Sequence, residues 1–283
     1  MRRYIAVAVF VVVAAARPAG QLNSAFTAED MLKVATASVL DLTDDGRRVA
    51  VAVRTLENNA TTDHRRFGDP TYVAPAMVDV VVYDTGSGRA DKVFKQLMNV
   101  RQAAWSRDGA RLALLTTTES SDQLPVTTAW IWDAARQALT EVPRRTNVSI
   151  ASTSELTWLP DGSKLVVALR DAAEDRAVQA TFKRLVDGPI VVHTSKETFL
   201  DWDALRRADR VRSIVELDPR TGETRALVPQ LKLTDYQLSR DGTFVTYRED
   251  ATEKTDYDVI SGTNNHLKIA RGGATKRLVC RGS

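Results

Sequence analysis

The sequence predicts an all-β protein built from repeated sheets of four antiparallel strands, arranged as the blades of a β-propeller, with about four blades present. Three observations support this prediction. An aspartate followed by glycine recurs four times between a short apolar segment and an alternating apolar strand. A variable segment and two further strand patterns follow each copy. The copies recur at a mean spacing of roughly 60 residues, which suits one four-stranded unit with a loop of variable length.

The repeated turns occur in LTDDGRRVAVAV from Leu42, WSRDGARLALL from Trp105, WLPDGSKLVVAL from Trp158 and LSRDGTFVTYRE from Leu238. Asp-Gly between alternating apolar residues is a strong hairpin signal, because glycine adopts a positive φ without a Cβ penalty. One such turn occurs in any β protein, whereas four with the same flanks indicate a repeat. The predicted structural turn residues are Asp45, Gly46, Asp108, Gly109, Asp161, Gly162, Asp241 and Gly242.

Four blades are expected over residues 37–283, at about 37–98, 100–148, 152–230 and 233–279. Each blade would contain a strand, the Asp-Gly turn, a second strand, a variable loop, and two more strands joined by a short turn. A β-sandwich also contains many short strands, and it is the structural alternative. A sandwich does not reuse one turn at one place in every set of four strands, so we favour the propeller.

The N-terminal residues 1–20 fit a cleaved export signal. Arg2 and Arg3 precede the apolar segment Tyr4–Ala16, and small residues follow it. This segment is shorter than the roughly 20 residues that span a membrane, so we expect no stable membrane anchor. In residues 21–36, Thr27 followed three positions later by Asp30 predicts a short capped helix. The mature protein is therefore expected to be exported, either periplasmic or secreted.

The net charge argues against nucleic acid as a partner. The formal charge of +3 includes Arg2, Arg3 and Arg17, and it falls to zero when residues 1–20 are removed. No basic stripe with interleaved aromatic residues remains, and the Arg-Arg pairs at Arg144 and Arg206 fit solvated surface charges.

The sequence indicates no metal site and no cofactor. The single cysteine, Cys280, cannot form an internal disulfide bond, and the three histidines show no metal-ligand spacing. The chain is 43% apolar, so it can form a substantial core without disulfide bonds, which is consistent with an exported protein.

Two long segments, Glu57–Met77 and Asp171–Arg210, interrupt the first and third blades between their second and third strands. Loops of this length in a compact domain are commonly functional or disordered. We expect both to pack on a neighbouring blade or domain, and the second to contain a strand at IVVHT, residues 190–194. The first is the candidate interdomain or substrate-gating loop, through Arg65, Arg66, Asp69 and Tyr72.

The S-x-D-G turns, FTAEDMLKV near the N-terminus and RFGDPTYVAP in the first long segment resemble the N-terminal propeller of exported serine peptidases. The resemblance is to the prolyl oligopeptidase family, with its dipeptidyl peptidase and acylaminoacyl peptidase groups, and it covers most of residues 26–279. It implies a propeller of seven or eight blades that caps an α/β-hydrolase domain and filters the peptides that reach the catalytic serine.

The sequence departs from that family in its catalytic features. No serine lies in G-x-S-x-G, and TGSGR at Ser87 is better explained as a hairpin turn. No alternation of strands and helices follows the fourth blade, and no Glu-Glu pair is present to hold a substrate amino terminus. We therefore expect no catalytic residues in this chain, and expect it to be a truncated part of a longer protein.

Two functional hypotheses follow. In the first, the chain is the non-catalytic propeller portion of a secreted serine peptidase, which gates peptide access and docks on a missing C-terminal hydrolase domain. In the second, it is a free-standing periplasmic propeller that binds a protein partner. A propeller acting as an enzyme by itself would need an acid, a base and a nucleophile, and the sequence suggests no such cluster.

Overall fold

The structure is a computed structural model, and it describes residues 26–60, 77–119, 125–190, 192–194, 196–255, 263–271 and 274–277. The proposed export signal and the candidate loop from Arg65 to Tyr72 lie outside these residues. The chain divides into two units, Met1–Val34 and Ala35–Ser283. In the first unit, helix α2 (Ala28–Lys33) carries the expected capping box: Thr27 Oγ1 accepts from Asp30 N at 3.2 Å, and Thr27 N donates to the Asp30 carboxylate at 2.9 Å.

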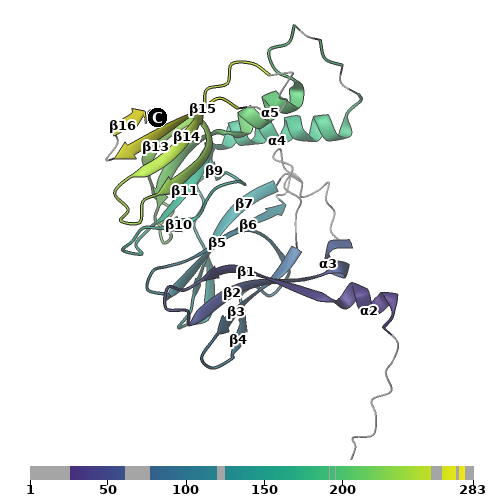
Figure 1. Cartoon of the computed structure of the whole chain (residues 1–283), viewed down its shortest axis with the longest axis vertical. Coiled ribbons are helices and arrows are strands. Elements are labelled where there is room, and N and C mark those ends of the chain that lie inside the picture. The colour runs from purple at the N-terminus through teal and green to yellow at the C-terminus, as the bar shows by residue number, and fades with distance from the viewer. Residues whose placement is uncertain are drawn as a thin grey trace, which may run out of the picture. The chain divides into compact units, whose positions relative to one another are not determined.

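The second unit is a partial β-propeller of four antiparallel blades, which confirms the predicted fold class (Figure 1). The first blade contains β1 (Ala35–Leu42), β2 (Arg48–Thr55), β3 (Met77–Asp84) and β4 (Ala90–Lys92). The second contains β5 (Met98–Trp105), β6 (Arg111–Glu119), β7 (Pro125–Asp133) and β8 (Ala138–Glu141). In both blades each strand pairs antiparallel with the next one along the chain.

The third blade has a divided inner strand. Both β9 (Val148–Ile150) and β10 (Thr157–Trp158) pair with β11 (Leu165–Asp171), which pairs with β12 (Val211–Leu217). Strand β13 (Thr224–Leu238) then pairs first with β12 and afterwards with β14 (Val245–Asp250), so it runs from the third blade into the fourth. The fourth blade is completed by β15 (Asn265–Arg271) and β16 (Ala274–Arg277).

The hydrophobic cores lie between consecutive blades, as the alternation of β6 and β11 illustrates. In β6, Leu112 and Leu114 belong to the core shared with the first blade, whereas Leu115 belongs to the core shared with the third. In β11, Val167 faces the second blade and Val166 the fourth. Successive side chains of a strand point to opposite faces, so a strand in a blade with neighbours on both sides can bury apolar residues on both of its faces.

The second long segment is helical, and our prediction of a loop with its own strand was wrong. It forms α4 (Ala172–Asp187) and α5 (Asp201–Asp209), whereas residue 190 and residues 192–194 lie in neither helix nor strand. Asp171 caps α4 by accepting from Ala173 N at 2.9 Å and Glu174 N at 3.1 Å, and the segment is rich in helix-forming residues. Helix α4 contacts α5, β9 and β11, so it packs on the blade that the segment interrupts, whereas Arg207 of α5 pairs with Asp250 of the neighbouring fourth blade. The first long segment begins with a short helix, α3 (Leu56–Ala60).

Candidate functional site

The predicted turn residues all lie in the turns between the first two strands of a blade. The four glycines have φ angles of +65° to +73°, and each glycine N–H donates to the carbonyl oxygen three residues earlier. Beside them, Ser239 Oγ donates to Asp241 Oδ1 at 2.7 Å and accepts from Phe244 N at 3.1 Å. Such bonds lower the pKa of Asp241 to about 2, led by the Ser239 hydroxyl and the Thr243 amide. Comparable local bonds lower the pKa of Asp45, Asp108 and Asp161.

These turns also join consecutive blades. Arg48 Nη1 donates to the carbonyl oxygen of Gly109 at 2.9 Å, and Arg111 Nη2 donates to that of Gly162 at 2.7 Å. Both arginines lie two positions after the turn glycine of their own blade, so the repeat places them equivalently. The predicted turn residues are therefore explained by folding and blade packing, and they bring no reactive groups together.

Helix α5 carries a buried ionic network that reaches the fourth blade. Asp250, whose side chain is 0% exposed, accepts from Arg207 Nη1 and Arg210 Nη1, each at 2.7 Å. Asp203 accepts from Thr255 Oγ1 at 2.6 Å and pairs with Arg207 at 3.3 Å. Each charged group in this network has a partner of opposite charge. The network therefore anchors α5 to the fourth blade and leaves no charged group of its own for a ligand.

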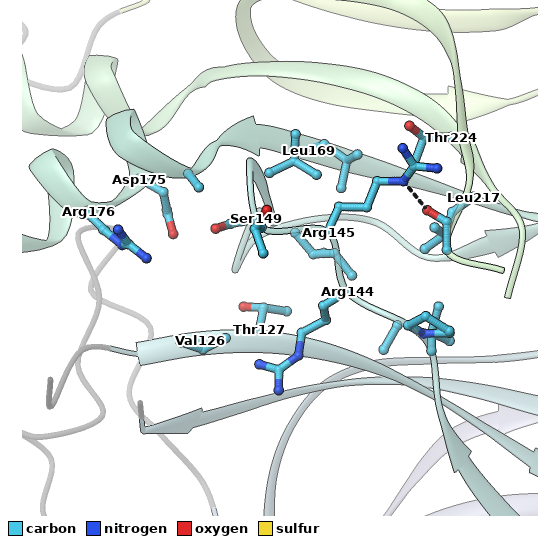
Figure 2. A pocket seen from close by; sticks show the side chains of 18 of the residues that line it. Val126, Thr127, Arg144, Arg145, Ser149, Leu169, Asp175, Arg176, Leu217 and Thr224 are labelled. Atoms are coloured by element: carbon cyan, nitrogen blue, oxygen red, sulfur yellow. Dashed lines mark hydrogen bonds between the residues drawn. The ribbon is translucent and has the colours of Figure 1, made fainter. Parts of the chain in front are cut away.

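A groove between the second and third blades is the strongest candidate site (Figure 2). It has a volume of about 380 Å³. Its walls come from β7, the β8–β9 connection, β9, the end of β11, the first turns of α4 and the β12–β13 turn. The buried floor is apolar and consists of Ala129, Val142, Leu169 and Leu217.

Close backbone packing shapes one end of the groove. Gly222, in the turn between β12 and β13, has a φ of +71°, and a Cβ atom there would overlap the carbonyl oxygen of Pro143. Only glycine therefore allows this turn to approach the β8–β9 connection so closely. The Gly222 carbonyl oxygen accepts from Arg145 Nε at 3.1 Å, which orients this arginine at the groove (Figure 2).

The rim of the groove is positively charged. Figure 2 shows Arg176 projecting from α4 and Arg144 from the β8–β9 connection, with Ser149 between them. Arg144 pairs with Glu141 at 2.9 Å, with both side chains substantially exposed. Arg176 is exposed and forms no hydrogen bond or ion pair with any other residue that the structure describes. Arg144 belongs to the pair that we expected to be a solvated surface charge, and the only sequence signal for the groove was PRRT at 143–146.

Two polar residues of α4 that line the groove are the partly buried Asp175 and the buried Gln179. Asp175 pairs with Arg170 at 3.1 Å. Burial raises the pKa of the Asp175 carboxyl, although the charge of Arg170 and a hydrogen bond from Ser149 act in the opposite direction. Gln179 is only 4% exposed, and its Oε1 atom has no hydrogen-bond partner among the residues that the structure describes. A buried acceptor without a partner is rare in folded proteins, and Oε1 is not solvent-accessible, so Gln179 can accept from a ligand donor only after its amide turns toward the groove.

The described residues that line the groove include no histidine, cysteine or lysine, and their only carboxylate, Asp175, which accepts from Ser149, is already paired with Arg170. Across the described part of the chain, no group of three or more His, Cys, Asp or Glu residues could hold a metal ion. No helix in the described part of the chain is long and apolar enough to span a membrane. What the groove offers chemically is an apolar floor, a cationic rim and one buried hydrogen-bond acceptor.

No protein-family model and no curated protein sequence matches this chain. Among solved structures, the chain is similar to Pyrococcus horikoshii acylaminoacyl peptidase, at 11% identity and a TM-score of 0.48 over 87% of this chain and 32% of the other. It is also similar to TolB from Acinetobacter baumannii, at 12% identity and a TM-score of 0.45 over 86% of this chain and 43% of the other. The β-propeller domain of the Trilobed protease from Pyrococcus furiosus matches at 11% identity and a TM-score of 0.46, over 86% of this chain and 57% of the other. The chain thus spans less than two thirds of the length of each.

Proposed function

We propose that this chain is the non-catalytic, peptide-binding propeller portion of an exported serine peptidase. In this role it holds peptide segments and controls their access to a hydrolase domain outside this sequence. The observation that supports the proposal is the groove between the second and third blades, which combines an apolar floor with a few polar groups. Ligand sites in proteins are commonly of this kind, with volumes of roughly 300–1,000 Å³.

The position of the groove suits a binding role. Its walls include strands, the capped helix α4 and the β8–β9 connection, in which Arg145 is held by its hydrogen bond to the Gly222 carbonyl oxygen. Sites supported by rigid elements bind with a smaller loss of conformational entropy than sites on mobile loops. A peptide of a few residues can place one apolar side chain on the floor and its polar backbone at the rim.

A free-standing periplasmic propeller that binds a protein partner is the second candidate. One observation favours it: every wall of the groove comes from the second and third blades and α4. Binding in the groove therefore needs no additional domain, and an exposed segment of a partner protein can occupy it as well as a substrate peptide can.

The test combines binding and hydrolysis measurements on the purified chain. A pool of fluorescent peptides of four to six residues is used in anisotropy titrations, and chromogenic peptides are used in hydrolysis assays. The proposal predicts saturable binding without hydrolysis. Hydrolysis that a serine-directed inhibitor blocks would overturn the non-catalytic role, and absence of peptide binding would overturn the binding role.

The two candidates differ in the size of the native polypeptide. An antibody raised against the chain would detect a product well above 31.2 kDa in the source cells if a hydrolase domain is attached, and one near 31.2 kDa if the propeller is free-standing. Export is tested on the same sample, by determining the N-terminal sequence of the mature protein. Cleavage between Ala14 and Gln21 is expected, and an intact Met1 on the mature protein would contradict a cleaved signal.

A further inference from the structure

We infer that the groove between the second and third blades selects peptides that carry both a carboxylate and an aliphatic side chain. This inference rests on the proposed function and names the class of peptide that the groove takes. It combines three independent features of the lining, namely the charge of the rim, the unpartnered acceptor and the apolar floor.

The charge of the rim favours an anionic ligand. Three arginines line the groove, Arg144, Arg145 and Arg176, against a single lining carboxylate, Asp175. Asp175 is already compensated by Arg170, and Arg144 pairs with the exposed Glu141. Among the described residues, Arg145 contacts only a neutral carbonyl oxygen, through Nε. Arg176 has no partner among the residues that the structure describes, so its guanidinium is available. Guanidinium groups bind carboxylates through paired N–H donors, which fixes the orientation of the ligand.

The buried acceptor indicates that the ligand also carries a donor. Oε1 of Gln179 is buried without a partner among the described residues, and a rotation of its amide toward the groove would let an N–H group of a bound ligand satisfy it. A peptide backbone supplies N–H donors beside its carboxylate, whereas inorganic phosphate at neutral pH offers mainly acceptors. The acceptor therefore favours a peptide over a simple inorganic anion.

The apolar floor indicates the side chain that accompanies the carboxylate. Ala129, Val142, Leu169 and Leu217 are each at most 5% exposed, and Val148 and Ile150 pack against them at the lining. A leucine, isoleucine or valine side chain of the ligand would extend this hydrophobic cluster, and binding would remove its apolar surface from water. Because the cationic rim borders the floor, a single residue with an aliphatic side chain and a nearby carboxylate can contact both.

The experiment compares three peptides by isothermal titration calorimetry with the whole purified chain. N-acetyl-Ala-Ala-Leu is used as the free acid and as the C-terminal amide, and N-acetyl-Asp-Leu amide carries its carboxylate on a side chain. We expect at least one carboxylate peptide to bind about tenfold more tightly than the neutral amide. The two anionic peptides distinguish a chain end from an acidic side chain as the source of the carboxylate. Equal affinity for all three peptides would overturn the inference.

Two exposed arginines of α4 provide matched variants. Arg176→Glu reverses the charge at the groove, and Arg184→Glu makes the same change in the last turn, at a residue that does not line the groove. We expect Arg176→Glu to weaken binding of the carboxylate peptides by about tenfold and to leave amide binding unchanged, and Arg184→Glu to change neither. An unchanged affinity of Arg176→Glu for the carboxylate peptides would contradict the inference.

Gln179→Met tests the buried acceptor, because it keeps the size of the side chain and removes Oε1. We expect it to weaken binding of acid and amide peptides alike, since both carry the backbone N–H. If the Gln179→Met variant unfolds at the normal temperature and binds the peptides unchanged, Gln179 does not contact the ligand. If no peptide binds the wild-type chain at all, the proposed function itself fails. Binding of all three peptides with equal affinity defeats only the charge selection inferred for the groove.

Discussion

Arg111 of the second blade donates a hydrogen bond from Nη2 to the carbonyl oxygen of Gly162, the turn glycine of the third blade, at 2.7 Å. Its guanidinium also lies 4.7 Å from the centroid of the Trp158 ring, and Trp158 Nε1 donates back to the carbonyl oxygen of Ala104 at 2.9 Å. The same repeated turn thus forms the hairpin within one blade and accepts a side chain from the preceding blade.

The first prediction concerns this contact. Arg111→Met should lower the free energy of unfolding by about 2–3 kcal/mol, because it removes a charge-assisted hydrogen bond and a cation–π contact. Arg48→Met is the matched variant, since Arg48 makes the equivalent bond to Gly109, and we expect a loss of about 1–2 kcal/mol there. Urea unfolding, monitored by tryptophan fluorescence, measures the free energy of unfolding of both variants. Equal losses in the two variants would show that the contact of Arg111 with Trp158 adds nothing to stability.

The second prediction uses the unequal surroundings of two turn glycines. Gly46 and Gly242 have φ angles of +70° and +73°, but a Cβ at Gly46 meets nothing within 4 Å, whereas one at Gly242 would lie 2.7 Å from Pro160 Cδ. Gly46→Ala should therefore cost only the left-handed strain of about 1–2 kcal/mol, and Gly242→Ala clearly more. The double variant Gly242→Ala with Pro160→Ala should recover the difference in a thermal unfolding cycle. Failure to recover it would indicate that the Pro160 contact is not the cause.

The third prediction is a pH dependence of the fourth turn. Hydrogen bonds lower the pKa of Asp241 from its ordinary value of 3.8 to about 2. A lowered folded-state pKa contributes stability that is present above pH 3.8 and is lost as the pH falls towards 2. The wild type should thus exceed Asp241→Asn in urea midpoint by a constant amount above about pH 5 and lose this advantage as the pH falls towards 2. A difference independent of pH would contradict the assignment to the carboxylate.

The fourth prediction concerns the buried network around α5. Asp250→Asn leaves Arg207 and Arg210 without their shared charge partner, so we expect a loss of about 3–5 kcal/mol in the free energy of unfolding. Asp235→Asn is the control, because the Asp235–Arg248 pair at 2.7 Å is about half exposed on both sides, and its loss should stay within about 1 kcal/mol. Chemical denaturation measures the free energy of unfolding of both variants. Comparable losses in the two variants would mean that burial does not strengthen the network.

The repeated turns and strands could be predicted from sequence because their causes are local. Glycine is needed where φ is positive, as at Gly109, and the strand after it alternates over a few residues. The helices α4 and α5 also have local causes, namely the cap at Asp171 and good helix formers, whereas the prediction for this segment was a strand at residues 190–194. Helix propensity and capping explain the segments on either side of that stretch, whose described residues lie in neither helix nor strand.

The groove could not be predicted, because its parts are far apart in the sequence. Arg176, Arg144 and Gly222 lie on different elements, and each looks like an ordinary surface or turn residue by itself. The buried acceptor of Gln179 has no sequence signature at all, since its burial depends on how α4 packs on the third blade.

By itself, the sequence determined the four-stranded repeat, the Asp-Gly turns and the capped N-terminal helix. Each of these follows from backbone preferences and hydrogen bonds within a few residues. The tertiary structure alone decided which blade faces each side of a strand, where the arginines of the turns point, and that a groove opens beside α4. Those features depend on contacts between residues distant in the chain, whose geometry is set by the packing of whole blades.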